Sequence, residues 1–182
     1  MITRGSRLVV LIALMVVFLD QLTKQLIKSQ LELGEVRPII GDLLKFHLIH
    51  NPGAAFSFLT GATWVFTLIA TVFSTWIVVN SHQVTSTPWM IGVGGILGGA
   101  VGNLIDRLTN VPGFGVGHVI DFIEIPYWPV FNIADSAIFL SAIALTVYAY
   151  KGISMDHLLK GQNNHKNNNH KNNNHNKAKH GE

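Results

Sequence analysis

The sequence predicts an all-α integral membrane protein with four transmembrane helices and small extended (β-like) elements in its two outer loops. Of the 182 residues, 48% are hydrophobic and only 13% are charged, whereas roughly 25% of the residues in soluble domains are charged. The stretch between Lys45 and Asp106 contains no Lys, Arg, Asp or Glu. Four segments approach the roughly 20 apolar residues that cross a bilayer.

The first predicted span covers residues 8–27 and follows Arg4 and Arg7. A charged start and an apolar run also characterise secretory signals. However, no A-x-A-like cleavage site follows, and Asp20 and Lys24 continue the helical pattern. We therefore expect this helix to be retained.

The other predicted spans cover residues 62–80, 88–105 and 133–150. The third is rich in glycine, and small residues four positions apart let helix backbones approach closely in lipid. We expect these glycines to serve mainly in helix packing. They form two neighbouring stripes: Gly94, Gly98 and Gly102 in one, Gly95 and Gly99 in the other.

Two segments of the outer loops are predicted to be extended. "KFHLIH" (45–50) and "GVGHVIDFIEI" (115–125) combine β-branched and aromatic residues in short runs near Gly and Pro.

Basic residues predict the orientation of the spans. Arg4 and Arg7 precede the first span, and Lys151 with five further lysines follows the fourth. Since Lys and Arg favour cytoplasmic loops, both termini are expected in the cytoplasm.

The last part of the chain differs in composition from the rest. Histidines recur every five residues among Asn and Lys in 156–182. We expect a disordered cytoplasmic tail there, with metal capture as the weaker alternative, and a four-span membrane domain in 1–155. Because six of the 13 basic residues follow Tyr150, the net charge of +3 implies no basic face for nucleic acid. The absence of cysteine excludes disulfides and thiol catalysis.

Several polar residues are predicted to lie at one depth in the membrane. At about 1.5 Å of rise per residue, Asp20, Asn103 and Asp135 lie about 20 to 24 Å above the inner interface, and Arg107 about 28 Å. These residues belong to three spans, and Asp121 precedes the fourth span closely enough to reach the same level. Because charged groups in a membrane cost several kcal/mol and usually face a protein interior or a wet cavity, this agreement indicates a built site.

Two pairs of these residues are predicted to hold the site in place. Asp20 and Lys24 have the i,i+4 spacing of a helical ion pair, and Asn103 and Arg107 share a helix face. For Lys24 and Arg107, an interfacial charge that extends to water is an equally good interpretation.

Asp121 and Asp135 suggest chemistry, since both lie in apolar surroundings without a basic residue nearby in sequence. Two carboxyl groups brought close together share a proton, so that one activates water while the other donates to a carbonyl oxygen, as in aspartic proteases. The alternative is that Asp135 merely caps the fourth helix.

Five motifs together resemble the lipoprotein signal peptidase (signal peptidase II) family. In the order of the chain they are "DQLTK" (20–24), "NPGAAF" (51–56), "GGAVGNLIDR" (98–107), "VIDF" (119–122) and "FNIADSAI" (131–138). The resemblance implies an intramembrane aspartic endopeptidase of the bacterial inner membrane, with its active site near the outer leaflet. Its substrates would be diacylglyceryl-modified prolipoproteins, cut just before the lipidated cysteine, and globomycin would inhibit it. No metal or other cofactor is implied.

The resemblance also assigns roles to residues. The catalytic pair falls on Asp121 and Asp135, while Asp20 and Lys24 match a motif that we expect to support the fold and the site. The positions that match the lining of the family's active site are Asn51, Gly53, Asn103, Arg107, Asn132 and Ala134.

The outer loops depart from the family's pattern. The stretch 107–121 looks longer than usual and 121–135 shorter, which leaves their conformation open. Two other classes compete with the peptidase: a small proton- or ion-coupled transporter, and a non-catalytic assembly protein whose glycines bind partner helices. The clustering of polar residues at one depth argues against the first, and Asp121 would have no role in the second.

Overall fold

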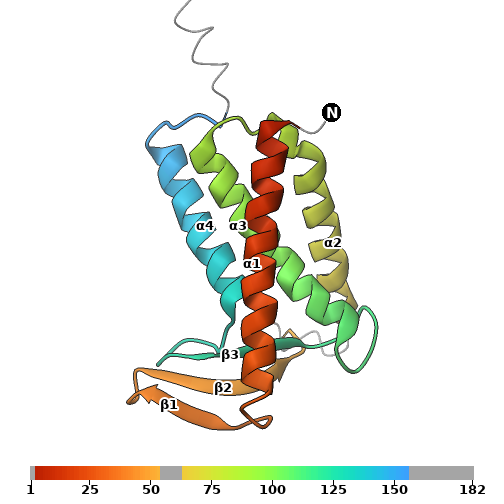
Figure 1. Cartoon of the computed structure of the whole chain (residues 1–182), viewed down its shortest axis with the longest axis vertical. Helices are drawn as coiled ribbons and strands as arrows, with labels where there is room; N and C mark the ends of the chain where they lie inside the picture. Colours follow the sequence, from red (N-terminus) through yellow and green to blue (C-terminus); the bar gives the residue numbers. More distant parts are fainter. Residues whose placement is uncertain (1–2, 54–62, 156–182) are drawn as a thin grey trace, which may run out of the picture.

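A computed structural model describes residues 3–53 and 63–155. Within these residues, four long helices form a bundle and a small sheet lies across one of its ends (Figure 1). The helices are α1 (Arg4–Lys28), α2 (Thr63–Asn80), α3 (Thr87–Thr109) and α4 (Ile133–Tyr150). A short 3₁₀ turn, η2 (Ser81–Gln83), follows α2.

The helices confirm the predicted spans. Each is long and apolar enough to cross a membrane. α1 begins before residue 8 and α3 continues past residue 105, because a span also includes the polar turns at the membrane surface. The predicted tail and residue 62 lie outside the described residues.

α3 is the centre of the bundle, and its two glycine stripes face different neighbours. A Cβ atom added at Gly98 would lie 2.8 Å from the Ala13 carbonyl oxygen on α1. One added at Gly99 would meet the Ala134 carbonyl oxygen on α4. The stripes therefore bring α1 and α4 against neighbouring faces of α3 at backbone contact distance, as the spacing predicted.

The core is divided into two parts that lie at opposite ends of the bundle. Apolar side chains of α1, α2 and α3 fill the end away from the sheet, while a second cluster fills the space between the end of α1 and the sheet. The first comprises Val9, Ala13, Ile77, Val84, Met90 and Leu97, and the second Ile27, Leu31, Leu48, Ile120 and Phe122. Large apolar side chains such as Leu14 and Phe18 are exposed on the outer faces of the helices, which suits contact with lipid.

The sheet has three antiparallel strands in the order β1 (Val36–Ile40), β2 (Leu44–Asn51) and β3 (Val119–Glu124). β2 and β3 confirm the predicted extended segments, although residues 115–118 precede the strand. β1 was not predicted. Because β2 follows α1 whereas β3 lies between α3 and α4, their pairing joins two loops that are distant in sequence, and it places Ile49 opposite Asp121.

The two loops that were expected to depart from the family's pattern have defined paths. Between α3 and β3, the Val111 carbonyl accepts from the His118 N–H at 3.0 Å, and the Arg107 carbonyl accepts from the Gly117 N–H at 3.0 Å. These bonds fold the loop back beside the end of α3. Between β3 and α4, Phe131 forms a bridge with Ile123, so a short turn suffices.

Candidate active site

The beginning of α4 supplies the first carboxyl group of the site. Asn132 is the N-cap, and its side-chain oxygen accepts from the Asp135 N–H at 2.9 Å. In return, Asp135 Oδ2 accepts from the Asn132 N–H at 3.4 Å, which completes a capping box. Asp135 thus takes part in the cap as its N3 residue, while Asn132 is the N-cap itself. The second oxygen, Oδ1, accepts from the Asn103 amide at 2.7 Å, so the same residue also belongs to a polar cluster.

β3 supplies the second carboxyl group. Asp121 lies in the middle of the strand and is only 1% exposed. Its Oδ2 accepts from the Asn51 amide at 2.7 Å, and its Oδ1 accepts from the Asn132 amide at 2.6 Å. Two asparagines from different elements therefore hold this carboxyl group.

Asn132 joins the two acids directly. Its Nδ2 contacts Asp121 and its Oδ1 contacts the backbone of Asp135, so a single amide group bridges β3 and α4. The same Nδ2 lies 3.0 Å from Asn103 Oδ1. The structure thus brings together Asp121, Asp135 and Asn103, as the comparison of depths predicted, and it adds Asn132.

The surroundings of Asp121 favour its protonated form. Burial and the nearby charge of Asp135 raise the pKa of Asp121 to about 7, against the opposing hydrogen bonds from Asn51 and Asn132. A carboxyl group that is half protonated near neutral pH can either give or accept a proton under physiological conditions.

A buried ionic network lies next to the pair of carboxyl groups and contacts it through Asn103. Lys24 is fully buried, and its Nζ lies 2.7 Å from Asp20 and 2.8 Å from Asp106. It also donates to Asn103 Oδ1 at 3.1 Å. The predicted i,i+4 ion pair is therefore present, and Lys24 is not an interfacial charge that extends to water.

Asp20 links this network to α4. Its Oδ1 accepts from the Ala134 N–H at 3.0 Å, in the first turn of the helix, where a negative charge is favourable. Ala134 itself is fully buried, and its Cβ would be 3.3 Å from a Cβ added at Gly102. The first helix thus fixes the beginning of the fourth.

Sequence reasoning missed two members of the network. Asp106 is 2% exposed, and its Oδ2 accepts from the Ile120 N–H at 3.0 Å, immediately before Asp121. Gln21 donates to Asp20 at 3.2 Å and to Asp106 at 3.1 Å. The signal for Asp106 was its position three residues after Asn103, which places both on one face of α3.

Asn51, Gly53 and Arg107 are the remaining predicted site residues. Asn51 Oδ1 accepts from the Gly53 N–H at 2.8 Å, and Gly53 has a φ of 114°, which favours glycine. A Cβ there would lie 2.8 Å from the Phe66 ring. The Arg107 guanidinium lies 5.3 Å from the centroid of that ring, and among the described residues its buried Nη1 has no hydrogen-bond partner.

A groove of about 750 Å³ opens beside Asp135. Its walls are mostly apolar and include Trp128, Phe131 and Phe139. Asp135 is partly exposed, unlike Asp121. The pair is therefore accessible from an apolar groove through Asp135.

The fold and the site define a class: a multi-pass helical membrane protein with a coupled pair of carboxyl groups at one end of its bundle. The sequence profile described as signal peptidase (SPase) II matches residues 12–151. The chain thus belongs to the signal peptidase II family of aspartic peptidases. None of the described residues form a cluster suited to a metal ion.

Individual proteins agree with this assignment. The chain is 43% identical to the lipoprotein signal peptidase of Rhodococcus jostii (strain RHA1), over 88% of this chain and 81% of the relative. It is 45% identical to that of Mycobacterium avium (strain 104), over 84% of each chain. A solved bacterial membrane enzyme superposes with a TM-score of 0.70 at 29% identity, over 80% of this chain and 89% of the other. These similarities favour the peptidase over the transporter and the assembly protein.

Proposed function

We propose that this chain removes signal peptides from prolipoproteins and that Asp121 and Asp135 are its catalytic residues. The observation that carries the proposal is that Asn132 donates to both carboxyl groups, from its side-chain amide to Asp121 and from its backbone N–H to Asp135. A helix cap alone needs only one of them. The family membership and the names of the relatives support the activity.

The pair acts on a water molecule and the scissile peptide bond. One carboxylate takes a proton from the water molecule while the oxygen of that water attacks the carbonyl carbon. The protonated partner donates its proton to the carbonyl oxygen. The tetrahedral intermediate then collapses, and a proton moves to the leaving amine. Because the two groups are coupled, the shared proton belongs to the pair and not to one residue.

The other polar residues position this pair and the substrate. Asn51, Asn103 and Asn132 hold the two carboxyl groups by hydrogen bonds. Arg107 is a candidate to donate from Nη1 to a backbone carbonyl of the substrate. The supporting residues Asp20, Lys24 and Ala134 fix α1 against α4, and Gly53 keeps space beside Phe66.

The groove beside Asp135 suits a lipid-modified substrate. Its apolar walls match acyl chains, and its polar residues are Asp135 and Ser136. We therefore assign diacylglyceryl-modified prolipoproteins as substrates, cut just before the lipidated cysteine, and membrane lipid as the surrounding solvent. We expect a globomycin-type inhibitor to compete for the same site, and no nucleic acid to bind.

The orientation follows from the basic residues and the site. With Arg4, Arg7 and Lys151 in the cytoplasm, the sheet and the carboxyl pair lie near the outer leaflet of the bacterial inner membrane. The cleavage site of an exported, lipid-anchored precursor would lie at that level.

The test uses the purified full-length protein and a diacylglyceryl-modified prolipoprotein, with loss of the signal peptide followed on a gel. Asp121→Asn and Asp135→Asn should each lower the rate at least about a hundredfold, the contribution expected of an acid–base group. Asp42→Asn, which changes a 99% exposed carboxylate, is the matched control and should keep the wild-type rate. The unlipidated precursor should remain uncut. Cleavage that survives either active-site change would remove that residue from the chemistry.

A further inference from the structure

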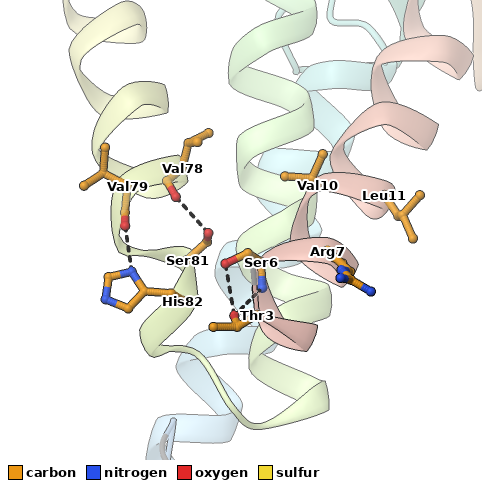
Figure 2. A pocket seen from close by; sticks show the side chains of 9 residues that line it. All are labelled: Thr3, Ser6, Arg7, Val10, Leu11, Val78, Val79, Ser81 and His82. Carbon is orange, nitrogen blue, oxygen red and sulfur yellow. Dashed lines mark hydrogen bonds between the residues drawn. The ribbon is translucent and has the colours of Figure 1, made fainter. Parts of the chain in front are cut away.

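A cavity of about 800 Å³ lies between α1 and α2 at the end of the bundle away from the sheet (Figure 2). Its apolar part is formed by Val10 and Leu11 on α1 and by Val78 and Val79 on α2. Its polar part is formed by Thr3, Ser6, Arg7, Ser81 and His82. The proposed reaction uses none of these residues.

The polar part of the cavity is cationic. No Asp or Glu is among the described residues that line it. Arg7 is exposed, and in the described part of the chain its guanidinium forms no hydrogen bond or ion pair. His82 Nδ1 lies 2.8 Å from the Val79 carbonyl oxygen. Because a carbonyl only accepts, Nδ1 carries the proton of that bond, and Nε2 takes no part in it.

The two parts of the cavity follow the polarity of a membrane leaflet. Arg7 lies in the first turns of α1 and His82 just after α2, where these spans leave the hydrocarbon. From Arg7 to Leu11 the helix rises about 6 Å, so the valines and leucine lie on the hydrocarbon side. Basic pockets between transmembrane helices are suited to anionic lipid headgroups.

We propose that this cavity binds one anionic glycerophospholipid. Its phosphate pairs with Arg7 beside the hydroxyl groups of Thr3 and Ser6, and an acyl chain lies between the apolar residues of α1 and α2. The cavity is at the opposite end of the bundle from Asp121 and Asp135, so this proposal does not depend on the catalytic assignment.

Native mass spectrometry of the full-length protein in detergent, titrated with phosphatidylglycerol, tests the charge. Arg7→Gln should weaken binding of the first lipid about fivefold, the factor that one basic residue contributes at an anionic membrane surface. Arg4→Gln is the matched control, because Arg4 begins the same helix and is not among the lining residues. It should change binding of the first lipid clearly less than Arg7→Gln does. Both variants keep the six basic residues after Tyr150, so any attraction by the tail is common to both.

A second pair of variants tests the cavity itself. Val79→Trp fills it, whereas Val72→Trp adds the same side chain two turns earlier on the same exposed face of α2, outside the cavity. Phosphatidylglycerol binding should be lost in the first variant and kept in the second. If Val79→Trp does not fold, Leu11→Trp with Leu14→Trp as its control makes the same comparison from α1.

Zwitterionic phosphatidylcholine should bind more weakly than phosphatidylglycerol to the wild type. Equal binding of the two lipids, equal effects of Arg7→Gln and Arg4→Gln, or full binding by the filled variant would each overturn the proposal. Any of these results would mean that lipid associates with the general surface charge or the outer apolar faces.

Discussion

At the scale of single residues, Asn132 both caps α4 and holds a carboxyl group of the site. As an N-cap it satisfies the Asp135 N–H, and as a donor it holds Asp121. The capping box fixes the backbone that carries Asp135, so the requirement for a regular helix start also sets the position of one carboxyl group relative to the other. A residue that only capped α4 would not need the buried contact with β3.

The raised pKa of Asp121 predicts how stability depends on pH. In the unfolded chain this carboxyl ionises near its ordinary pKa of 3.8, but in the folded protein only near 7. The folded state therefore binds the extra proton between these values, so the contribution of Asp121 to stability is present below about pH 4 and is lost as the pH rises to about 7.

Asp121→Asn removes this loss. Relative to the wild type, the variant should gain roughly 1.4 kcal/mol per pH unit between pH 4 and 7 and little more above that. Thermal unfolding in detergent from pH 4.5 to 8.5 measures the difference. Asp42→Asn, at an exposed loop position, should show no such trend. A difference between Asp121→Asn and the wild type that stays constant with pH would contradict the assignment.

Lys24 provides a second prediction. Lys24→Met leaves Asp20 and Asp106 buried without their cation, which should cost about 3–5 kcal/mol of stability. Lys28→Met, one turn further on the exposed side of α1, is the control and should be nearly neutral. The unfolding temperatures of the two variants, measured in the same detergent, test this prediction. Equal unfolding temperatures would mean that Lys24 is not a structural cation.

At the scale of elements, α3 determines how closely the helices pack. Its glycines let the backbones of α1 and α4 approach from two sides, and this spacing allows Lys24 on α1 to reach Asp106 and Asn103 on α3. The polar network can therefore form only when the three helices pack at this close spacing.

Gly98→Ala tests this dependence. The new methyl group would lie 2.8 Å from the Ala13 carbonyl oxygen, so α1 must move away. This movement should cost about 1–3 kcal/mol of stability, although Ala has the better helix propensity. We expect a lower unfolding temperature together with slower cleavage. The control is Gly113→Ala, whose Cβ would meet nothing within 4 Å. Unchanged stability and cleavage in Gly98→Ala would show that α1 and α3 tolerate a wider spacing.

The sequence predicted the helices better than the contacts between loops. Hydropathy identified all four spans, and local spacing identified the Asp20–Lys24 pair, because both signals lie within one element. Asp106 was missed since its partners, Lys24 and the Ile120 N–H, belong to other elements, and next to Arg107 it resembles an ordinary charge at a helix end. The pairing of β2 with β3 was missed for the same reason.

At the scale of the whole molecule, the site lies at one end of the bundle, and the start of α1 with Arg4 and Arg7 and the end of α4 before Lys151 lie at the other (Figure 1). This polarity predicts which surface each end meets. Because the chain contains no cysteine, a single introduced cysteine reports which side of the membrane its position faces.

In intact spheroplasts, a membrane-impermeant maleimide should label Asp42→Cys, next to the sheet, and should leave Gln83→Cys unlabelled until the membrane is permeabilised. Both positions are exposed, so their reactivity differs only by side. The reverse pattern would invert the proposed orientation and separate the site from exported substrates.

The Asp20–Lys24 pair has a consequence for the biogenesis of the molecule. Because Asp20 and Lys24 pair within one helix, each of these charges has its counter-charge as soon as α1 has been synthesised, before any other span has been made. Asp106 and the Ala134 N–H join them only after α3 and α4 have arrived, and Asp135 comes with the last helix. On the proposed catalytic assignment, a nascent chain without α4 has Asp121 but lacks Asp135, so we expect it to cut no neighbouring protein until its synthesis is nearly complete.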